Sequence, residues 1–221
     1  MSPFNSESKP CSRRHFCRVA SAAALPFFAA GAAYAQGKPV EGQHYRRLRT
    51  PQNTGNERGE VLEFFWYGCP ACYKLEPALN QWLARKPADV SFKRVPSIIH
   101  AVSKSHQRIF YALDAMGLEE RLHAQVFAAV QADSAALQEL PEIQALMSKL
   151  GVDAAKFAQV YGSFSVQSRC QQADRLIQAY EGTGVPMLAV NGRFVTTPAM
   201  AGGDKAALTV VDYLLGLGKK A

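Results

Sequence analysis

Cysteine is scarce in this sequence, with five residues in 221, and one pair has the spacing C-x-x-C, Cys69 and Cys72. A structural zinc site needs four ligands, and the sequence contains neither a second C-x-x-C nor a C-x-x-H. His100 and His106 could supply further ligands, but their spacing gives no sign of such a site. The sequence therefore predicts no bound metal and no cofactor.

Runs of basic residues are missing as well. The formal net charge is +7, but the lysines and arginines that follow residue 35 are scattered along the chain. Nucleic-acid-binding surfaces instead gather basic residues on one face or helix. The sequence therefore predicts no nucleic-acid partner.

The apolar run at residues 19–33 is too short to cross a membrane, since it has about 15 residues where a spanning helix needs roughly 20. Pro26 also interrupts it, and three arginines precede it. The small-x-small sequence A-Y-A follows at residues 33–35, as at a signal-peptide cleavage site. We therefore expect residues 1–35 to be a signal peptide that is cleaved near Ala35, and the mature protein to lie in the periplasm.

The basic start of this segment also fits the twin-arginine type of export signal. Arg13 and Arg14 are adjacent, Ser12 precedes them, and Phe16 follows two positions later. Cys17 stands where such a signal usually has an aliphatic residue. Two adjacent arginines also occur by chance in ordinary signal peptides, but the flanking residues favour the twin-arginine type.

Removal of this segment leaves Cys69, Cys72 and Cys170. Export places them in an oxidising compartment, where three cysteines are too few for a disulfide scaffold and one has no partner in the chain. Cys69 lies where an apolar run ends and a helical pattern begins, and a helix N-terminus favours a thiolate. The pair Cys69 and Cys72 is therefore predicted to carry out redox chemistry rather than to staple the fold.

The segments around this pair predict a strand, a helix and a second strand. Residues 60–67 are apolar and rich in β-branched and aromatic side chains, which is typical of a buried strand. Residues 70–85 place apolar side chains on one helical face, with Pro70 in the first turn, where its missing N–H does no harm. Residues 90–95 are the second strand, and residues 44–49 are a candidate edge strand.

The rest of the chain predicts a helical block and then a hairpin. Apolar residues recur at helical spacing between residues 103 and 181, with breaks that indicate about five helices. Residues 187–195 predict a β-hairpin around the turn Asn191-Gly192. A last helix is expected over residues 205–215, with Asp204 as its N-cap.

This order of elements, with C-x-x-C at the first strand–helix junction, resembles the DsbA family of exported thiol-disulfide oxidoreductases. Three separated motifs carry the resemblance: V-L-E-F-F at residues 61–65, C-P-A-C-Y at residues 69–73, and G-V-P at residues 184–186 with V-N-G after it. The resemblance implies an α/β protein with a thioredoxin fold and an inserted all-helical domain.

The resemblance also implies domain boundaries and a catalytic pair. The thioredoxin-like domain is expected at residues 36–100 and 183–221, and the inserted helical domain at residues 101–182. Cys69 is expected to be the nucleophile, because it is the outer thiol at the helix end. Cys72 is then the buried resolving thiol, and the two form the redox-active disulfide.

Glu63 lies in the middle of an apolar strand, where an unpaired carboxylate is costly and its pKa should rise. In the resembling family, an acid at this position lies beneath the active site and helps to move the proton of the buried cysteine. We therefore expect proton transfer from Glu63. The alternative is an acid that reaches solvent or pairs with a basic residue such as Lys93.

The resemblance further implies that the Val185–Pro186 bond is cis and faces the active-site disulfide. Val185 would then offer its backbone N–H and C=O to an extended client segment. The alternative is an ordinary trans proline at the start of an edge strand. The expected motif and substrate-binding residues are Pro70, Ala71, Val185, Pro186, Trp66 and Tyr67.

An apolar rim that receives unfolded clients is expected from Trp66 and Tyr67, together with Met187 and Tyr73. The alternative for these side chains is a place in the core. Cys170 is expected to be a small buried apolar residue rather than an accessible third thiol. The remaining histidines are expected to be surface or structural residues without a role in the chemistry: His44, His100, His106 and His123.

Ala71 departs from the family pattern, which usually has histidine between the proline and the second cysteine. Histidine there would donate to the Cys69 thiolate or place a positive charge beside it, and so stabilise the reduced form. The alanine side chain offers neither. We therefore expect a higher pKa of Cys69 and a less oxidising couple than in the histidine version.

Together these observations predict a periplasmic thiol:disulfide oxidoreductase that introduces disulfides into exported proteins. The expected partners are unfolded or reduced exported proteins and a membrane quinone-linked reoxidase of the DsbB type, and the expected state is a monomer. One alternative is a reductase or isomerase with a less oxidising couple. Another is a periplasmic holdase that binds clients without thiol exchange.

Overall fold

The computed structural model describes residues 37–55, 59–98, 100–101, 103–133 and 137–218. The predicted signal peptide lies outside these residues. The described chain runs through strand, strand, helix, strand, five helices, two strands and two helices. This is the order that the sequence predicts, with one short helix added near the C-terminus.

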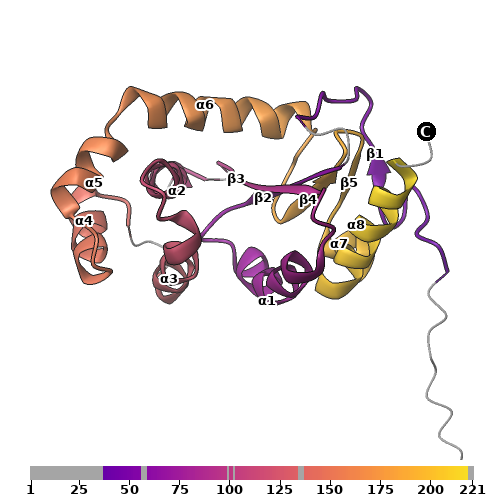
Figure 1. Cartoon of the computed structure of the whole chain (residues 1–221), viewed down its shortest axis with the longest axis horizontal. Helices are drawn as coiled ribbons and strands as arrows, with labels where there is room; N and C mark the ends of the chain where they lie inside the picture. Colours follow the sequence, from indigo (N-terminus) through magenta and orange to yellow (C-terminus); the bar gives the residue numbers. More distant parts are fainter. Residues whose placement is uncertain (1–36, 56–58, 99, 102, 134–136, 219–221) are drawn as a thin grey trace, which may run out of the picture. The chain divides into compact units, whose positions relative to one another are not determined.

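A mixed sheet of five described strands forms the centre of the fold, in the order β1-β5-β4-β2-β3 (Figure 1). The central strand β2 pairs parallel with β3 and antiparallel with β4. All six of its residues are buried, as expected for an apolar strand covered on both faces. The strands are β1 (Arg46–Arg47), β2 (Glu60–Phe65), β3 (Ser91–Pro96), β4 (Met187–Val190) and β5 (Phe194–Thr196).

Helix α1 (Pro70–Arg85) follows β2 and packs with α8 (Asp204–Gly218) on one face of the sheet (Figure 1). Pro70 starts α1, where a proline has no hydrogen bond to lose and a preset φ. Apolar side chains one turn apart on α1, such as Leu75 and Leu79, are fully buried against Val61 of β2. This packing holds the N-terminus of α1 at the end of the central strand.

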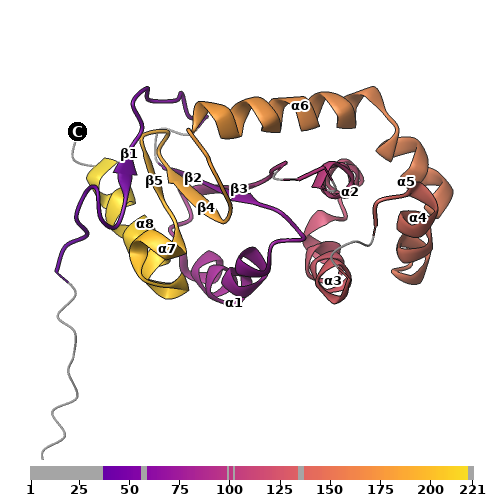
Figure 2. The same ribbon diagram turned by 180° about the vertical axis from the view of Figure 1, so that it is seen from behind.

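Five helices lie between β3 and β4 in the sequence, and α6 runs along the face of the sheet opposite α1 (Figure 2). Their buried apolar residues form one cluster that continues to Phe64 and Phe65 of β2. The fold therefore has the predicted class, a thioredoxin-type α/β sheet with a helical insertion. The five helices are α2 (Ser103–Ala115), α3 (Glu119–Ala132), α4 (Leu140–Lys149), α5 (Ala154–Tyr161) and α6 (Phe164–Ala179).

The hairpin between β4 and β5 forms at the predicted turn. Asn191 and Gly192 have φ values of 53° and 61°, the left-handed pair that a tight two-residue hairpin requires. Gly192 also accepts a hydrogen bond from the backbone N–H of Gln52, with N and O 2.7 Å apart. A Cβ on Gly192 would lie 2.1 Å from the backbone oxygen of Gln52. The turn therefore needs glycine both for its conformation and for this close approach.

The C-terminal segment differs from its prediction in two details. The last helix begins at Asp204 itself, so Asp204 belongs to the first turn instead of capping it. A short helix, α7 (Pro198–Ala201), precedes it, and the Thr197 hydroxyl accepts the backbone N–H of Met200 as its cap. Its four residues are too few for a periodic pattern. In the described part of the chain, no helix has the length and hydropathy needed to span a membrane.

Replacing Gly192 by alanine is expected to lower the free energy of unfolding by roughly 2–4 kcal/mol, through a left-handed φ and a forced backbone shift. Gly117→Ala is the matched control, because Gly117 has a φ of 68° but no atom within 4 Å of an added Cβ. It should lose only about 1 kcal/mol. Urea unfolding followed by circular dichroism measures both, and equal losses would contradict the close-approach argument.

Candidate active site

The two thiols of C-P-A-C lie at the junction of β2 and α1. Cys69 is the N-cap of α1, with φ −86° and ψ 113°, and is partly exposed. Cys72 lies in the first helical turn and is fully buried. Both are free thiols in the structure. The outer and inner positions expected for the two cysteines are therefore the ones they occupy.

The segment before β4 faces the outer thiol. The Cys69 thiol donates to the backbone oxygen of Val185, with Sγ and O 3.6 Å apart. The Val185–Pro186 peptide bond is cis, as predicted. Two segments that are 116 residues apart in the sequence therefore meet at the reactive sulfur.

The environment drives the two thiol pKa values apart. A hydrogen bond from the Cys72 thiol lowers the pKa of Cys69 to about 6, against partial burial and with help from the backbone N–H groups of Cys72 and Ala71. Burial raises the pKa of Cys72 far above its ordinary value, and the neighbouring Cys69 adds to this. At neutral pH the outer sulfur is therefore mostly a thiolate and the inner sulfur a thiol.

Ala71 contributes through its backbone. Its side chain is exposed and has no donor, but its N–H is one of the groups that lower the pKa of Cys69. Because the N-terminal N–H groups of a helix have no partner within it, they are available to a sulfur at the N-cap whatever residue stands at position 71. The thiolate is thus stabilised without histidine.

A shallow groove of about 440 Å³ opens beside the thiols. Its lining is mostly apolar, and Arg46 is the one charged residue among the described residues that line it. Ala71 and the Val185–Pro186 pair form part of it, and the other apolar contributors are Met187, Val195, Pro198, Ala199 and Met200. An extended peptide that reached Cys69 would lie against the members of this lining that keep exposed surface, among them Ala71, Val185 and Ala199.

Glu63 is fully buried and its charge is matched from the next strand. Its Oε2 lies 3.3 Å from Nε of Arg94, its direct neighbour in the parallel β2–β3 register. Arg94 also contacts Glu76 of α1 at 3.3 Å and Glu119 of α3 at 3.8 Å. Neither oxygen of Glu63 has a hydrogen-bond partner among the described residues. Charges from β2, β3, α1 and α3 therefore meet in one buried cluster.

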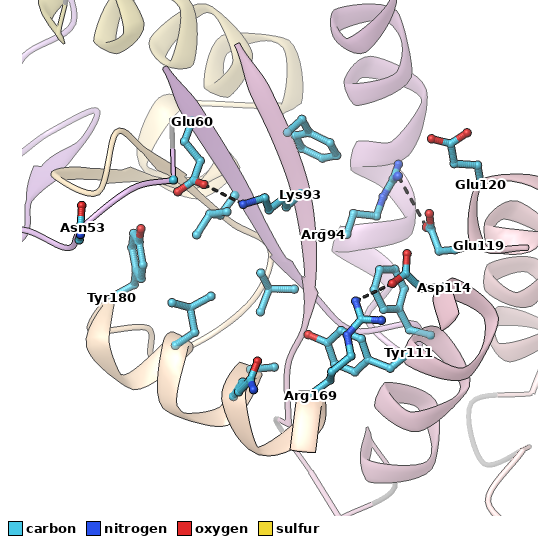
Figure 3. A pocket seen from close by; sticks show the side chains of 18 residues that line it. Asn53, Glu60, Lys93, Arg94, Tyr111, Asp114, Glu119, Glu120, Arg169 and Tyr180 are labelled. Atoms are coloured by element: carbon cyan, nitrogen blue, oxygen red, sulfur yellow. Dashed lines mark hydrogen bonds and ion pairs between the residues drawn. The ribbon is translucent and has the colours of Figure 1, made fainter. Parts of the chain in front are cut away.

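The alternative partner of Glu63, Lys93, lies on the other face of the sheet. Its Nζ pairs with Glu60 at 3.1 Å. Successive side chains of a strand point to opposite faces, so Arg94 faces Glu63 while Lys93 does not. Figure 3 shows Lys93 and Arg94 extending in different directions from β3, toward Glu60 and Glu119 respectively.

Burial raises the pKa of Glu63 to about 7, as the sequence predicts. The Glu76 carboxylate contributes to this rise, while Arg94 and then His123 oppose it. Glu63 in turn raises the pKa of Cys72. Glu63 is therefore an acid that titrates near neutrality and is electrostatically coupled to the inner thiol.

The predicted apolar rim is wrong for Tyr67 and Met187. Tyr67 is 1% exposed, because its ring packs edge-on against Phe65 and Phe127. Met187 is also buried, since it pairs with Phe64 in the β2–β4 ladder. These two side chains belong to the core and offer little surface to a client.

Trp66 and Tyr73 remain at the surface. Trp66 is half-buried, and its indole N–H donates to Nδ1 of His106 at 3.0 Å. Tyr73 is exposed and lies against Phe127 of α3. An aromatic surface beside the thiols is thus present, but it is smaller than predicted.

Cys170 is buried, and burial raises its pKa to about 11, in agreement with the expected apolar role. A second and larger cavity, about 600 Å³, is lined by residues of β2, β3, α2, α3 and α6 (Figure 3). None of the three described cysteines lines this cavity. Among the described residues, no three His, Cys, Asp or Glu side chains are arranged to hold a metal ion.

Four members of the buried cluster are absent from the sequence-based site prediction: Glu76, Arg94, Glu119 and His123. Glu76 stands four residues after Cys72, on the same helical face, which was the one available hint. Arg94 could be found only from the strand register. Glu119 and His123 belong to the helical insertion, and their spacing fits any amphipathic helix.

A scan of family models matches residues 60–212 to the DSBA-like thioredoxin domain, a range that includes both cysteines, Glu63 and Pro186. The chain belongs to the DsbA-like family. This confirms the predicted family resemblance and fold class.

Similar proteins and solved structures support the same family assignment. Thiol:disulfide interchange protein DsbA of Azotobacter vinelandii is 40% identical over 156 residues, 71% of this chain and 73% of that protein. The protein of the same name from Bordetella parapertussis is 38% identical over 208 residues, 93% and 98% of the two chains. The crystal structure of Pseudomonas aeruginosa DsbA has a TM-score of 0.78 at 34% identity, and the match covers 82% of this chain and 95% of that one.

The Cys69 thiol is expected to titrate at about pH 6, read from thiolate absorbance at 240 nm in the reduced protein. Cys72→Ala removes the strongest stabilising donor and should raise this midpoint, whereas Cys72→Ser keeps a donor and should raise it less. Cys170→Ala is the control and should leave the midpoint unchanged. An unchanged midpoint in Cys72→Ala would contradict the role of the Cys72 thiol in lowering the pKa of Cys69.

Proposed function

We propose that this DsbA-family protein is a thiol:disulfide oxidoreductase that introduces disulfides into exported proteins. The observation that carries the proposal is the pairing of a low-pKa thiol, Cys69, with a buried high-pKa thiol, Cys72, in the first turn of one helix. A couple of this kind favours its reduced form, because the reduced form contains a stabilised thiolate. Its disulfide is therefore an oxidant.

The first step is attack of a client thiolate on Sγ of Cys69 in the Cys69–Cys72 disulfide. A client–Cys69 disulfide forms, the enzyme disulfide breaks, and the electron pair leaves on the sulfur of Cys72. Cys69 is the sulfur attacked, because it is partly exposed while Cys72 is buried.

Glu63 is the acid for this step. A buried Cys72 thiolate is unstable and takes up a proton. Glu63, with a pKa of about 7, is substantially protonated at neutral pH and acts electrostatically on Cys72. An acid whose pKa is close to the working pH is suited to such a transfer.

In the second step a second thiolate of the client attacks the client sulfur of the mixed disulfide. The client disulfide forms, and Cys69 leaves as a thiolate. A thiol of low pKa is a good leaving group, so the hydrogen bonds that lower the pKa of Cys69 also favour release. The client dithiol loses two electrons and two protons. The enzyme takes up the two electrons and ends with Cys69 as a thiolate and Cys72 as a thiol, while Glu63 regains one proton from solvent and the other proton stays in solvent.

Client binding is assigned to the groove beside the thiols. The backbone of Val185 is placed against Cys69 and can pair with an extended segment. Pro186 and Ala71 line the same groove. Pro70, which is exposed, and Trp66, which is half-buried, are proposed to extend the client-binding surface. Since backbone pairing does not depend on client side chains, such a groove accepts many sequences.

Export and reoxidation complete the proposal. Residues 1–35 are a signal peptide, of twin-arginine type, that directs the protein to the periplasm, where a membrane quinone-linked partner of the DsbB type reoxidises the dithiol. The mature chain acts as a monomer, with residues 36–100 and 183–221 as the thioredoxin-like domain and residues 101–182 as the inserted helical domain.

One observation favours a second candidate. Position 71 carries alanine, whose exposed side chain offers Cys69 neither a donor nor a charge, so the couple is less oxidising than one with histidine there. A disulfide reductase or isomerase is the activity that such a couple would also support. A client-binding holdase has no comparable support, because it would not need two thiols with separated pKa values.

A Cys72→Ser variant is expected to accumulate mixed disulfides with exported proteins, because its Cys69 thiolate can attack their disulfides while the thiol that would release the adduct is gone. Acid trapping followed by non-reducing electrophoresis detects them. The matched control, Cys69→Ser with Cys72→Ser, should form none. A holdase would give no adducts in either variant, and that result would remove the proposed exchange reaction.

Ala71→His is expected to lower the pKa of Cys69 and to make the couple more oxidising. If the pKa falls by one unit, the thiolate is stabilised by about 1.4 kcal/mol, which corresponds to a potential about 30 mV higher. Equilibration with glutathione, followed by thiol trapping, measures the potential. Ala71→Ser is the control for a change of side-chain size, and an unchanged potential in Ala71→His would refute the role given to position 71.

A further inference from the structure

His123 is a buried titratable residue that the exchange steps above do not use. It lies on α3 and is 4% exposed. Its Nδ1 is 3.0 Å from the Tyr67 hydroxyl and 3.1 Å from Oε1 of Glu119, and its Nε2 is 3.5 Å from Oε1 of Glu76. One imidazole therefore connects the helical insertion with α1 and with the loop that leads to Cys69.

Aromatic rings enclose this imidazole on its other sides. The rings of Phe65, Phe110 and Phe127 have centroids 5.4, 6.3 and 5.2 Å from that of His123. Such a shell keeps water away and makes the remaining electrostatic contacts stronger. The charge of a protonated His123 therefore acts mainly on the carboxylates of the cluster.

The groups that face His123 can be named element by element. Tyr67 precedes α1, Glu76 lies on α1, and Glu119 lies on α3. Arg94 of β3 lowers the pKa of His123. His123 in turn lowers the pKa of Glu63 of β2. Figure 3 shows Arg94 reaching from β3 to Glu119, so the cation of β3 and the imidazole of α3 share a carboxylate.

We propose that His123 is a positioning residue for thiol exchange, whose charge decides whether Glu63, the acid coupled to Cys72, carries its proton. The proposal rests on the function proposed above. It assigns the helical insertion a direct electrostatic part in the chemistry of the thioredoxin-like domain.

The charge count of the cluster gives the reason. Three carboxylates, Glu63, Glu76 and Glu119, are balanced by Arg94 and, when it is protonated, by His123. With both cations present, two carboxylates are neutralised and Glu63 can lose its proton at the cost of one net negative charge. With neutral imidazole the same loss leaves two net negative charges in a buried site, which is far less favourable.

His123 is the adjustable member of this pair of cations. An arginine stays charged at every pH of interest, whereas histidine changes its charge near neutrality. Burial alone would lower the pKa of His123, but its contacts with Glu119 and Glu76 raise it above the ordinary value. This shift favours the cation, which holds down the pKa of Glu63.

His123→Gln tests this directly, since glutamine keeps polar contacts but has no charge. The readout is the Glu63 carboxyl carbon, followed by NMR during a pH titration of the reduced protein. We expect its midpoint to rise by about half a pH unit or more, because a neighbouring positive charge is lost. The falling limb of client-peptide oxidation against pH should move upward with it. His44→Gln, at a site outside the cluster, should change neither.

A reciprocal measurement does not depend on the folding of the histidine variant. Coupling between two sites is mutual, so Glu63→Gln should lower the pKa of His123, read from its imidazole NMR signals. An unchanged Glu63 midpoint in His123→Gln, or an unchanged His123 midpoint in Glu63→Gln, would overturn the proposal. A wild-type protein without exchange activity would instead overturn the proposed function. The two outcomes are distinguishable, because both titrations can be measured in a protein that has no activity.

Discussion

The hydrogen bond between the two thiols in the first turn of α1 is the interaction on which the site depends. It lowers the pKa of Cys69 and raises that of Cys72, and it exists because a C-x-x-C spacing at a helix N-terminus places one sulfur outside and one inside. The fully buried strand β2 and the packing of α1 on the sheet hold that helix end in place. The rest of the fold serves to keep one thiol in reach of solvent and the other away from it.

The second constraint is electrostatic. A buried ion pair rarely stabilises a fold, since desolvation offsets the Coulombic gain, so a cluster with more carboxylates than cations is a cost to the folded protein. Burial, together with the excess of carboxylates, raises the pKa of Glu63 to about 7. The arrangement that destabilises the fold therefore also provides an acid that works at neutral pH, and residues of both the sheet and the inserted helices set its pKa.

Patterns within a single segment predict most of the fold, and contacts between segments account for what was missed. The apolar run of β2, the Asn191-Gly192 turn and the periodic helices each contain their own signal. Glu63 was recognisable as an acid inside an apolar strand, but its partner depends on the β2–β3 register, which places Arg94 rather than Lys93 opposite it. The prediction for Tyr67 is wrong because an aromatic residue beside a reactive motif is equally compatible, in the sequence, with a surface rim and with the core. Its hydrogen bond to a histidine 56 residues away decides the matter.

The five helices between β3 and β4 separate the two halves of the site along the chain. Cys69 and Val185 are 116 residues apart, and loop-closure entropy makes contacts of that separation slow to form. Helices α2 to α6, in contrast, are built from local contacts that form early. A chain that is synthesised from its N-terminus therefore presents both thiols before Val185, the backbone partner of Cys69, has been made. During that interval the two cysteines are a reduced pair without the Val185 contact, and any oxidant or disulfide in their surroundings can react with them.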